Sequence, residues 1–281
     1  MYLEDLARLS TQSEISTIQE ESLNEQQEAS AEQQELLIPE NSPTLLLDES
    51  TTRFSGAEWF NEIQRQNIIL AGIGGIGSWV ALQLARMCPA SLFMYDDDTV
   101  ETVNMAGQLY ARDDIGKLKV SAMNGMISRY TNMQNIYSIN DRFTENTEAG
   151  NIMICGFDNM AARKVFFTKW RDHVTSKDPE ERCNCLFIDG RLSAEVLQVY
   201  CFTGDNSLAQ QKYAEECLFS DNQADETVCS YKQTTYMANM IGSIIVNLFT
   251  NFVANEVAGA PIRELPFFTT YDGYSMQLKI E

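Results

Sequence analysis

Short apolar runs alternate with longer amphipathic stretches along most of the chain, and this alternation predicts the fold. Five apolar runs have the length and composition of buried strands: residues 67–71, 91–95, 135–139, 151–155 and 185–189. Three stretches between or after them have helical spacing of apolar residues: 77–88, 117–130 and 159–174. Strands that alternate with helices are typical of a mostly parallel sheet with helices on both faces. We therefore expect a Rossmann-like, doubly wound α/β fold.

The last third of the chain has a different pattern. Residues 195–202 alternate between apolar and polar side chains, which predicts an antiparallel strand. Residues 267–270 and 274–280 flank Asp272-Gly273, a pair that is typical of tight hairpin turns. We therefore expect antiparallel strands at the C-terminus of the sheet.

Residues 237–258 form the longest apolar stretch. Asparagine or serine recurs at every fourth residue and would form a polar stripe on one helix face: Asn239, Ser243, Asn247, Asn251 and Asn255. A membrane-spanning helix is almost free of such groups over about 20 residues. We interpret the stretch as a long helix packed into the fold, and we expect no membrane partner.

The first 50 residues are acidic and of low complexity. They contain twelve acidic residues and one basic residue. Their few apolar side chains cannot offset the entropy that the segment would lose on ordering. We predict a disordered acidic tail over residues 1–50, followed by a single domain over residues 51–281.

Net charge and cysteine usage restrict the possible partners. The formal charge is −20, whereas binding to nucleic acid or an anionic membrane relies on Lys and Arg side chains that neutralise phosphate. Seven cysteines occur without regular paired spacing, and no basic-then-apolar segment begins the chain. These features favour a cytoplasmic protein with reduced thiols that binds no nucleic acid.

A glycine turn after the first predicted strand is the first candidate for chemistry. Gly72, Gly74 and Gly77 have the spacing that allows a tight turn, close approach of a phosphate and close packing of the next helix on the strand. Gly75 and Ser78 complete the turn. The helix that follows directs its free backbone N–H groups toward a bound phosphate, so the turn predicts nucleotide binding.

Carboxylates follow two of the predicted strands. Asp96 comes at the end of strand 91–95, where a carboxylate can hold ribose hydroxyls. Asp97 and Asp98 come next; three adjacent acids suit a solvated loop, but their repulsion is better tolerated beside a cation. Asp158 follows strand 151–155, where it can hold Mg²⁺ against a triphosphate, cap the next helix, or do both.

Lys119 stands at the start of the helix predicted after Gly116. Its ammonium group can neutralise charge that builds on a phosphate during transfer; the alternative is a solvated lysine on the protein surface. Lys117 is two residues away and would face in a different direction, so Lys119 is the stronger candidate.

Four motifs, in this order, resemble the ThiF/MoeB/HesA-type family of E1-like adenylating enzymes. The family's glycine turn matches residues 72–78, and its D-x-D-x-V-x-x-x-N run matches the segment from Asp96 through Asp98 to Asn104. Gln108 follows that run. The family lysine matches Lys119, and the D-N-x-x-x-R element matches residues 158–163. The resemblance covers roughly residues 54–280.

This resemblance implies an activity and its partners. A member of the family would bind ATP and adenylate the C-terminal carboxylate of a ubiquitin-like protein, a sulfur-carrier protein or a peptide. Lys119 would steady the α-phosphate, and Mg²⁺ on Asp158 would offset charge on the leaving pyrophosphate. The resemblance also implies a homodimer.

The chain departs from the family at a cationic position. Many relatives have an arginine in the pattern N-L-x-R-Q, where this chain has Gly107 before Gln108. Relatives often carry another arginine ahead of the first strand, which reaches into the site of the partner subunit. Arg53 is the candidate for that role. Without such a cation, the protein would bind ATP but catalyse poorly.

Cysteine spacing also departs from the family pattern. The usual structural zinc site has two C-x-x-C pairs, which this chain lacks; Cys183, Cys185, Cys217 and Cys229 would supply four ligands, but their spacing does not require a metal. We expect no zinc. Some relatives pass the acyl group to a cysteine, and Cys229 is the candidate, unless it is merely a small buried apolar residue.

Two other functions remain open. The glycine turn and Asp96 alone would suit an NAD-dependent oxidoreductase, although Lys119, Asn104 and Asp158 have no clear role in one. A nucleotide-binding scaffold with weak or no catalysis would explain the glycine at position 107.

Overall fold

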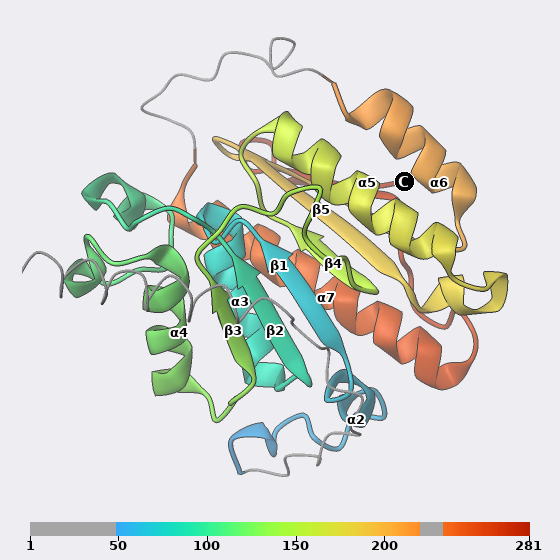
Figure 1. The fold of residues 1–281 in the computed structure, drawn as a ribbon, viewed down its shortest axis with the longest axis horizontal. Helices are drawn as coiled ribbons and strands as arrows, with labels where there is room; N and C mark the ends of the chain where they lie inside the picture. Colours follow the sequence, from blue (N-terminus) through green and yellow to red (C-terminus); the bar gives the residue numbers. More distant parts are fainter. Residues whose placement is uncertain (1–48, 220–232) are drawn as a thin grey trace, which may run out of the picture. The chain divides into compact units, whose positions relative to one another are not determined.

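The computed structural model describes residues 49–219 and 233–281. Almost all of the predicted acidic tail, and also Cys229, lie outside the described residues. The strands are β1 (Asn67–Ala71), β2 (Ser91–Tyr95), β3 (Ile136–Ile139), β4 (Ile152–Cys155), β5 (Leu186–Ser193), β6 (Val196–Thr203), β7 (Phe268–Asp272) and β8 (Gln277–Ile280). They form one sheet of eight strands in the order β3-β2-β1-β4-β5-β6-β7-β8 (Figure 1).

Helices cover the two faces of this sheet. The α-helices are α2 (Phe60–Ile63), α3 (Gly75–Met87), α4 (Lys119–Tyr130), α5 (Met160–Ser176), α6 (Ser207–Lys212) and α7 (Thr235–Ala258). Short helical turns are η1 (Glu49–Thr51), η2 (Thr102–Ala106), η3 (Arg112–Asp114), η4 (Pro179–Asn184) and η5 (Tyr213–Cys217). In Figure 1, α5 lies on the near face of the sheet, and α3 and α7 lie behind it.

Strand direction confirms the predicted fold class. Strands β1 to β5 pair in parallel, whereas β6, β7 and β8 pair antiparallel. The chain first winds from β1 through β2 to β3, and then crosses back to β4 on the other side of β1. Right-handed crossovers therefore place α5 on the face opposite α3. The carboxyl ends of β1, β2 and β4 meet where the winding reverses, which is the usual ligand position in such sheets.

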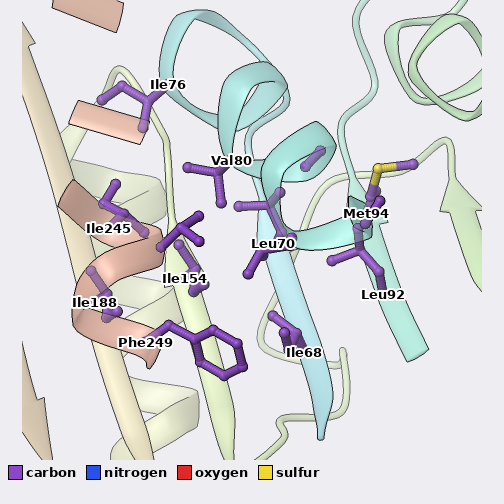
Figure 2. Close-up of a cluster of buried hydrophobic side chains, with 14 of the residues drawn as sticks. Ile68, Leu70, Ile76, Val80, Leu92, Met94, Ile154, Ile188, Ile245 and Phe249 are labelled. Carbon is purple, nitrogen blue, oxygen red and sulfur yellow. The ribbon is translucent and has the colours of Figure 1, made fainter. Parts of the chain in front are cut away.

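The apolar runs of the sequence form the core between the sheet and α3 and α7. Leu70 of β1 pairs with Met94 of β2 and with Ile154 of β4. Val80 of α3 and Phe249 of α7 pack over these strands and are fully buried (Figure 2). Each such side chain stabilises the fold by about 1.5–3 kcal/mol. This packing holds the strand ends at fixed positions.

Helix α7 confirms the interpretation of the long apolar stretch. It is the helix among the described residues that is long and apolar enough to cross a membrane, but 67% of its most apolar window is buried inside the fold. The polar stripe lies on its outer side, with Ser243 and Asn247 exposed. Asn255 accepts a hydrogen bond from the backbone N–H of Arg263 (2.8 Å) and donates one to its carbonyl (2.9 Å). The stripe thus also binds the segment that leads to β7.

Most boundaries differ from the sequence prediction by one or two residues, and β5 runs four residues further, to Ser193. Two of the differences have a clear local cause. Helix α3 begins at Gly75 and not at residue 77, because Gly74 already takes the non-helical cap conformation. The C-terminal hairpin does not turn at Asp272-Gly273 alone. The carboxylate of Asp272 accepts hydrogen bonds from the N–H groups of Tyr274 and Ser275, and a longer turn precedes β8.

Candidate functional site

The glycine turn after β1 contains two positions where only glycine fits. A methyl group at Gly72, whose φ is +85°, would lie 2.8 Å from the backbone of Gly156. A methyl group at Gly77 would lie 1.9 Å from the Gly72 carbonyl oxygen. A methyl group would fit at Gly74, where the nearest atom would be Nε2 of Gln108 at 3.8 Å. The turn is therefore tight toward the sheet at Gly72 and Gly77 and leaves room for a ligand at Gly74.

Helix α3 begins at this open position. Its cap residue, Gly74, has no side chain to bind the N–H groups of the first helical turn, and those groups have no partners within the helix. They carry the positive end of the helix dipole. The residues present thus fit a phosphate at the start of α3.

Asp96 ties the glycine turn to the end of β2. Its carboxylate accepts hydrogen bonds from the N–H of Ile73 (2.7 Å) and from the N–H of Asp98 (2.9 Å). Burial raises the pKa of Asp96, and the nearby Lys119 ammonium opposes that rise. A carboxylate offers about four acceptor positions, so these two bonds leave capacity for a ribose hydroxyl.

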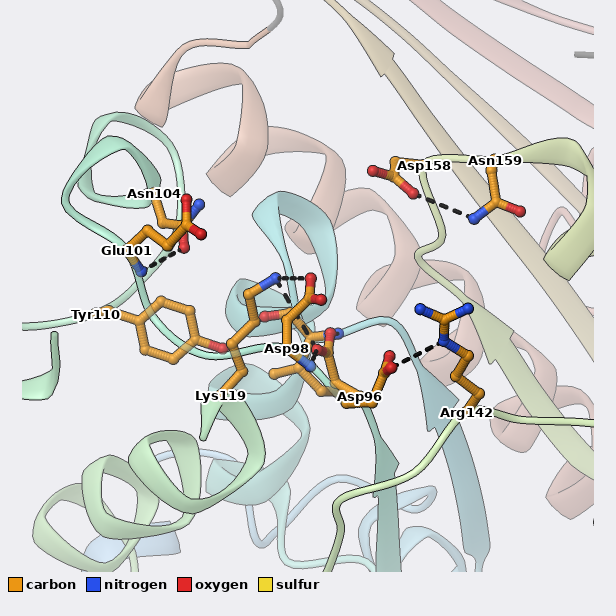
Figure 3. Close-up of polar contacts among 11 residues, drawn as sticks. Asp96, Asp98, Glu101, Asn104, Tyr110, Lys119, Arg142, Asp158 and Asn159 are labelled. Atoms are coloured by element: carbon orange, nitrogen blue, oxygen red, sulfur yellow. Dashed lines mark hydrogen bonds and ion pairs between the residues drawn. The ribbon is translucent and has the colours of Figure 1, made fainter. Parts of the chain in front are cut away.

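Lys119 is buried beside the same strand end. Its Nζ lies 2.6 Å from Oδ2 of Asp98 and 3.9 Å from Oδ1 of Asp96, and its side chain is 7% exposed. The alternative of a solvated surface lysine is therefore wrong. Lys117 pairs with Asp114 instead, and its side chain is 55% exposed. Figure 3 shows the contacts of the Lys119 ammonium with both aspartates.

The segment that follows the aspartates is held against the glycine turn by hydrogen bonds. Asn104 accepts one from the N–H of Glu101 (2.8 Å), which stabilises η2. The buried Ser78 hydroxyl accepts one from the N–H of Leu109 (3.0 Å). The Tyr110 hydroxyl donates one to the carbonyl of Ile73 (2.6 Å). Asn104 and Ser78, both predicted nucleotide contacts, thus have partners within the protein.

Gln108 differs from those two residues. Its Oε1 is buried and has no hydrogen-bond partner in the described part of the chain, and its Nε2 lies beside Gly74. An unsatisfied buried amide costs free energy. Its position at the open side of the turn fits a ligand contact.

Asp158 lies at the carboxyl end of β4, as predicted, and its side chain is exposed. It does not cap helix α5. The cap is Asn159, whose side chain accepts a hydrogen bond from the N–H of Ala162 (2.8 Å). Asn159 also donates to Asp158 (3.3 Å). Because β1 lies between β2 and β4, Asp158 and Lys119 stand on two sides of the glycine turn (Figure 3).

A buried ionic network beneath Asp158 was not predicted. The carboxylate of Asp189, in β5, accepts hydrogen bonds from Nε of Arg163 (2.9 Å), Nε of Arg191 (2.7 Å) and the hydroxyl of Tyr213 (2.9 Å). Arg163 also donates to the carbonyl of Phe157. Burial would raise the pKa of Asp189, but the two arginines lower it, so the carboxylate is charged. The network fixes the Asp158 loop to β5. The sequence feature that could have indicated this network is Asp189 itself, an aspartate at the end of a predicted buried strand.

Of two further arginines, Arg142 lies near the site and Arg53 lies far from it. Arg142, in the loop after β3, pairs with Asp97 (2.8 Å) and adds a cation that was not predicted (Figure 3). Arg53 is exposed. It lies in the segment from η1 to α2, at the opposite end of β1 from the glycine turn (Figure 1). Arg53 therefore does not join this site within one chain.

The cysteines show no metal-binding arrangement in residues 49–219 and 233–281, where no group of three or more His, Cys, Asp and Glu could hold an ion. Cys183 is exposed, whereas Cys185 and Cys217 are buried. Cys229 lies outside the described residues, so its predicted thioester role remains a prediction.

A model of a known protein family matches the part of the chain that carries these residues. The model of the ThiF family matches residues 48–281. Ubiquitin-like modifier-activating enzyme 5 of Oryza sativa subsp. japonica is 38% identical over 63 residues, which are 22% of this chain and 15% of that protein. The tRNA threonylcarbamoyladenosine dehydratase of Escherichia coli K12 is 35% identical over 74 residues, 26% of this chain and 28% of that protein. The alignments thus span a small part of these relatives.

Solved structures share the fold at low sequence identity. PaaA has a TM-score of 0.63 and 16% identity, and the match covers 93% of this chain and 82% of PaaA. E. coli MccB, solved with ATP, has a TM-score of 0.58 and 13% identity over 80% of this chain and 65% of MccB. E. coli TcdA, solved with AMP, has a TM-score of 0.56 and 16% identity over 76% of this chain and all of TcdA.

Proposed function

Because the chain belongs to the ThiF family, we propose that it is an E1-like adenylyltransferase that transfers AMP from ATP to a carboxylate. The substrate is the C-terminal carboxylate of a ubiquitin-like protein, a sulfur-carrier protein or a peptide. Relatives named for activating a ubiquitin-like modifier support a protein substrate. The net charge of −20 disfavours the nucleic acid that another relative is named for.

Buried Lys119 is the observation that carries this proposal. Its ammonium group stands next to the open glycine turn and is balanced by Asp96 and Asp98. Phosphoryl and adenylyl transfer need a fixed positive charge beside the reacting phosphate. Hydride transfer between NAD and a substrate needs no such cation, so the arrangement favours adenylation over an oxidoreductase.

The chemistry proceeds by one displacement at phosphorus. A carboxylate oxygen of the substrate attacks the α-phosphate of ATP, the bond to the β-phosphate breaks, and pyrophosphate leaves with the electron pair. Lys119 offsets the charge that develops on the α-phosphate oxygens. The first backbone N–H groups of α3 donate hydrogen bonds to phosphate oxygens. Gln108 and Asp96 orient the nucleotide.

A divalent cation completes the proposed site. Mg²⁺ is usually held by one or two carboxylates together with substrate phosphates and water, and exposed Asp158 fits that role. The metal would offset charge on the pyrophosphate.

Two further residues have proposed roles outside this set. In a homodimer, Arg53 of one chain would reach into the nucleotide site of the other chain. If the acyl group is transferred to the enzyme, the Cys229 thiolate attacks the carbonyl carbon of the acyl-adenylate. A thioester forms, and the bond to the AMP phosphate oxygen breaks to release AMP.

Pyrophosphate exchange tests the proposal. The purified full-length chain, given Mg-ATP, labelled pyrophosphate and a candidate carboxylate partner, should form labelled ATP. Adducts that carry AMP should appear by intact mass of the partner. Absence of exchange with every ubiquitin-like, sulfur-carrier and peptide substrate would contradict the proposal.

The glycine at position 107 favours a second candidate, a nucleotide-binding scaffold. Such a protein would bind Mg-ATP in calorimetry but would exchange no pyrophosphate with any partner. The same pair of measurements therefore separates the two functions.

A further inference from the structure

The chain enters helix α7 directly over the glycine turn. Gln233 forms an isolated parallel bridge with Ala194, which stands between β5 and β6. The Thr235 hydroxyl donates a hydrogen bond to the carbonyl of Ala106 at the end of η2. Residues 233–235 are thus fixed on two sides, although they lie more than 120 residues after η2 in the sequence.

The side chain of Gln233 lies between two glycines of the site. A methyl group at Gly75 would lie 1.8 Å from its Oε1. A methyl group at Gly107 would lie 2.8 Å from its Cδ and 2.9 Å from its Cγ and Nε2. Any side chain at either glycine would therefore displace the Gln233 amide. Because Gly107 has no side chain, the Gln233 amide can occupy the space beside it.

The Gln233 amide has hydrogen-bonding capacity to spare. No hydrogen bond joins this amide to another residue in the described part of the chain, 49–219 and 233–281. Gln108 stands at the neighbouring glycine, Gly74, with its Oε1 buried and without a partner. Two side-chain amides thus flank the start of α3, where the backbone N–H groups fit a phosphate.

We propose that Gln233 donates a hydrogen bond to the triphosphate of ATP, in the space that Gly107 leaves open. This inference rests on the proposed function. The amide supplies a neutral donor close to where many relatives carry an arginine. It orients the phosphate chain over the first turn of α3 but adds no charge, so Lys119 remains the principal cation of the described site.

Calorimetry with Mg-ATP tests the role of Gln233. The Q233A variant should bind ATP about tenfold more weakly, because a hydrogen bond to a charged phosphate is lost. The isosteric Q233E variant should bind more weakly still, because its carboxylate repels the phosphates. Binding of adenosine, which has no phosphate, should be unchanged in both. The matched control is Q134A, an exposed glutamine before β3.

A substitution at Gly107 provides an independent test. Its φ of −138° accepts alanine, but the new methyl group would push the Gln233 amide aside. G107A should therefore weaken ATP binding about as much as Q233A, and the double variant should be no weaker than either one. The matched control is G125A in α4, where an added methyl group meets nothing within 4 Å.

The outcomes separate this inference from the proposed function. If Q233A binds ATP as the wild type does, or more tightly, Gln233 does not contact the phosphates and the inference is wrong. It is also wrong if adenosine binding falls in parallel with ATP binding. If the wild-type protein binds no ATP, the proposed function fails, and this inference fails with it.

Discussion

Lys119 carries the sharpest prediction for a single side chain. Lysine is almost never fully buried unless it is paired, and this one lies between two aspartates. Replacing Lys119 with alanine should lower the rate of pyrophosphate exchange by about 10²- to 10³-fold, because the charge on the phosphate loses a fixed partner. The rate is measured with saturating Mg-ATP and partner.

Lys117 provides the matched control. It is also near the start of α4, but it is largely exposed and pairs with Asp114. Lys117→Ala should exchange pyrophosphate at the wild-type rate. Equal rates for wild type and Lys119→Ala, with both proteins folded by circular dichroism, would remove Lys119 from the mechanism.

The sequence predicts where these side chains stand better than what they bind. Asp96 and Lys119 come together because Asp96 follows β2 at the carboxyl edge of the sheet, and Lys119 begins α4 there, where its N–H donates a hydrogen bond to the carbonyl of Asp98 (2.9 Å). Ser78 occupies the expected turn, yet its hydroxyl is used by Leu109. The motif specifies position, whereas hydrogen-bond partners depend on packing. Gln233 has no local signal, because its contacts form only when α7 returns to the glycine turn.

Strand β5 carries a prediction about stability. Its buried Asp189 is the common partner of Arg163 and Arg191. Asp189→Asn should destabilise the protein by about 3–5 kcal/mol at pH 7, because two buried arginines lose their charged partner. Urea unfolding measures the difference, and Asp178→Asn, an exposed aspartate, is the matched control.

The pH dependence of that difference has a defined sign. The pKa of Asp189 is lower in the folded protein than its ordinary value of 3.8. Its contribution is therefore present above pH 3.8 and is lost as the pH falls through the folded pKa. The gap between wild type and Asp189→Asn should narrow in that acidic range. A gap that stays constant down to pH 2 would mean that the charge of Asp189 is unimportant.

Elements were predictable where the signal is local. The apolar runs gave β1 and β2 at their observed bounds, since a buried strand needs only a short uninterrupted stretch. The open alternative that Asp158 caps α5 was wrong by one residue, because Asp158 and Asn159 are both good caps and only backbone geometry separates them. The hairpin turn was misjudged because Asp272 binds two backbone N–H groups at once.

The thermal stability of the whole protein at alkaline pH should depend on Glu256, near the end of α7. Burial, with some help from the charge of Glu62, raises its pKa to about 8. Its contribution to stability is fully present below the ordinary value of 4.5 and is lost as the pH rises through about 8. Glu256→Gln should therefore raise the melting temperature at pH 9 and leave it unchanged at pH 5.

Glu145→Gln, at an exposed loop position, is the control for that experiment and should shift neither melting temperature. A Glu256→Gln variant that melts like the wild type at pH 9 would show that Glu256 is ionised without cost. The sequence could not indicate this residue. Glu256 lines one pocket together with Glu62 and Asn151, and these three residues are far apart along the chain.

The anchoring of the Asp158 loop to β5 has a consequence for the order in which the protein is built. A nascent chain that ends before β5 already contains the glycine turn, Lys119 and Asp158. It lacks Asp189, so Arg163 has no carboxylate to hold it and the loop that carries Asp158 has no fixed place. We therefore expect a polypeptide that ends before β5 to leave the Asp158 loop without its anchor, and so to lack the complete proposed nucleotide site.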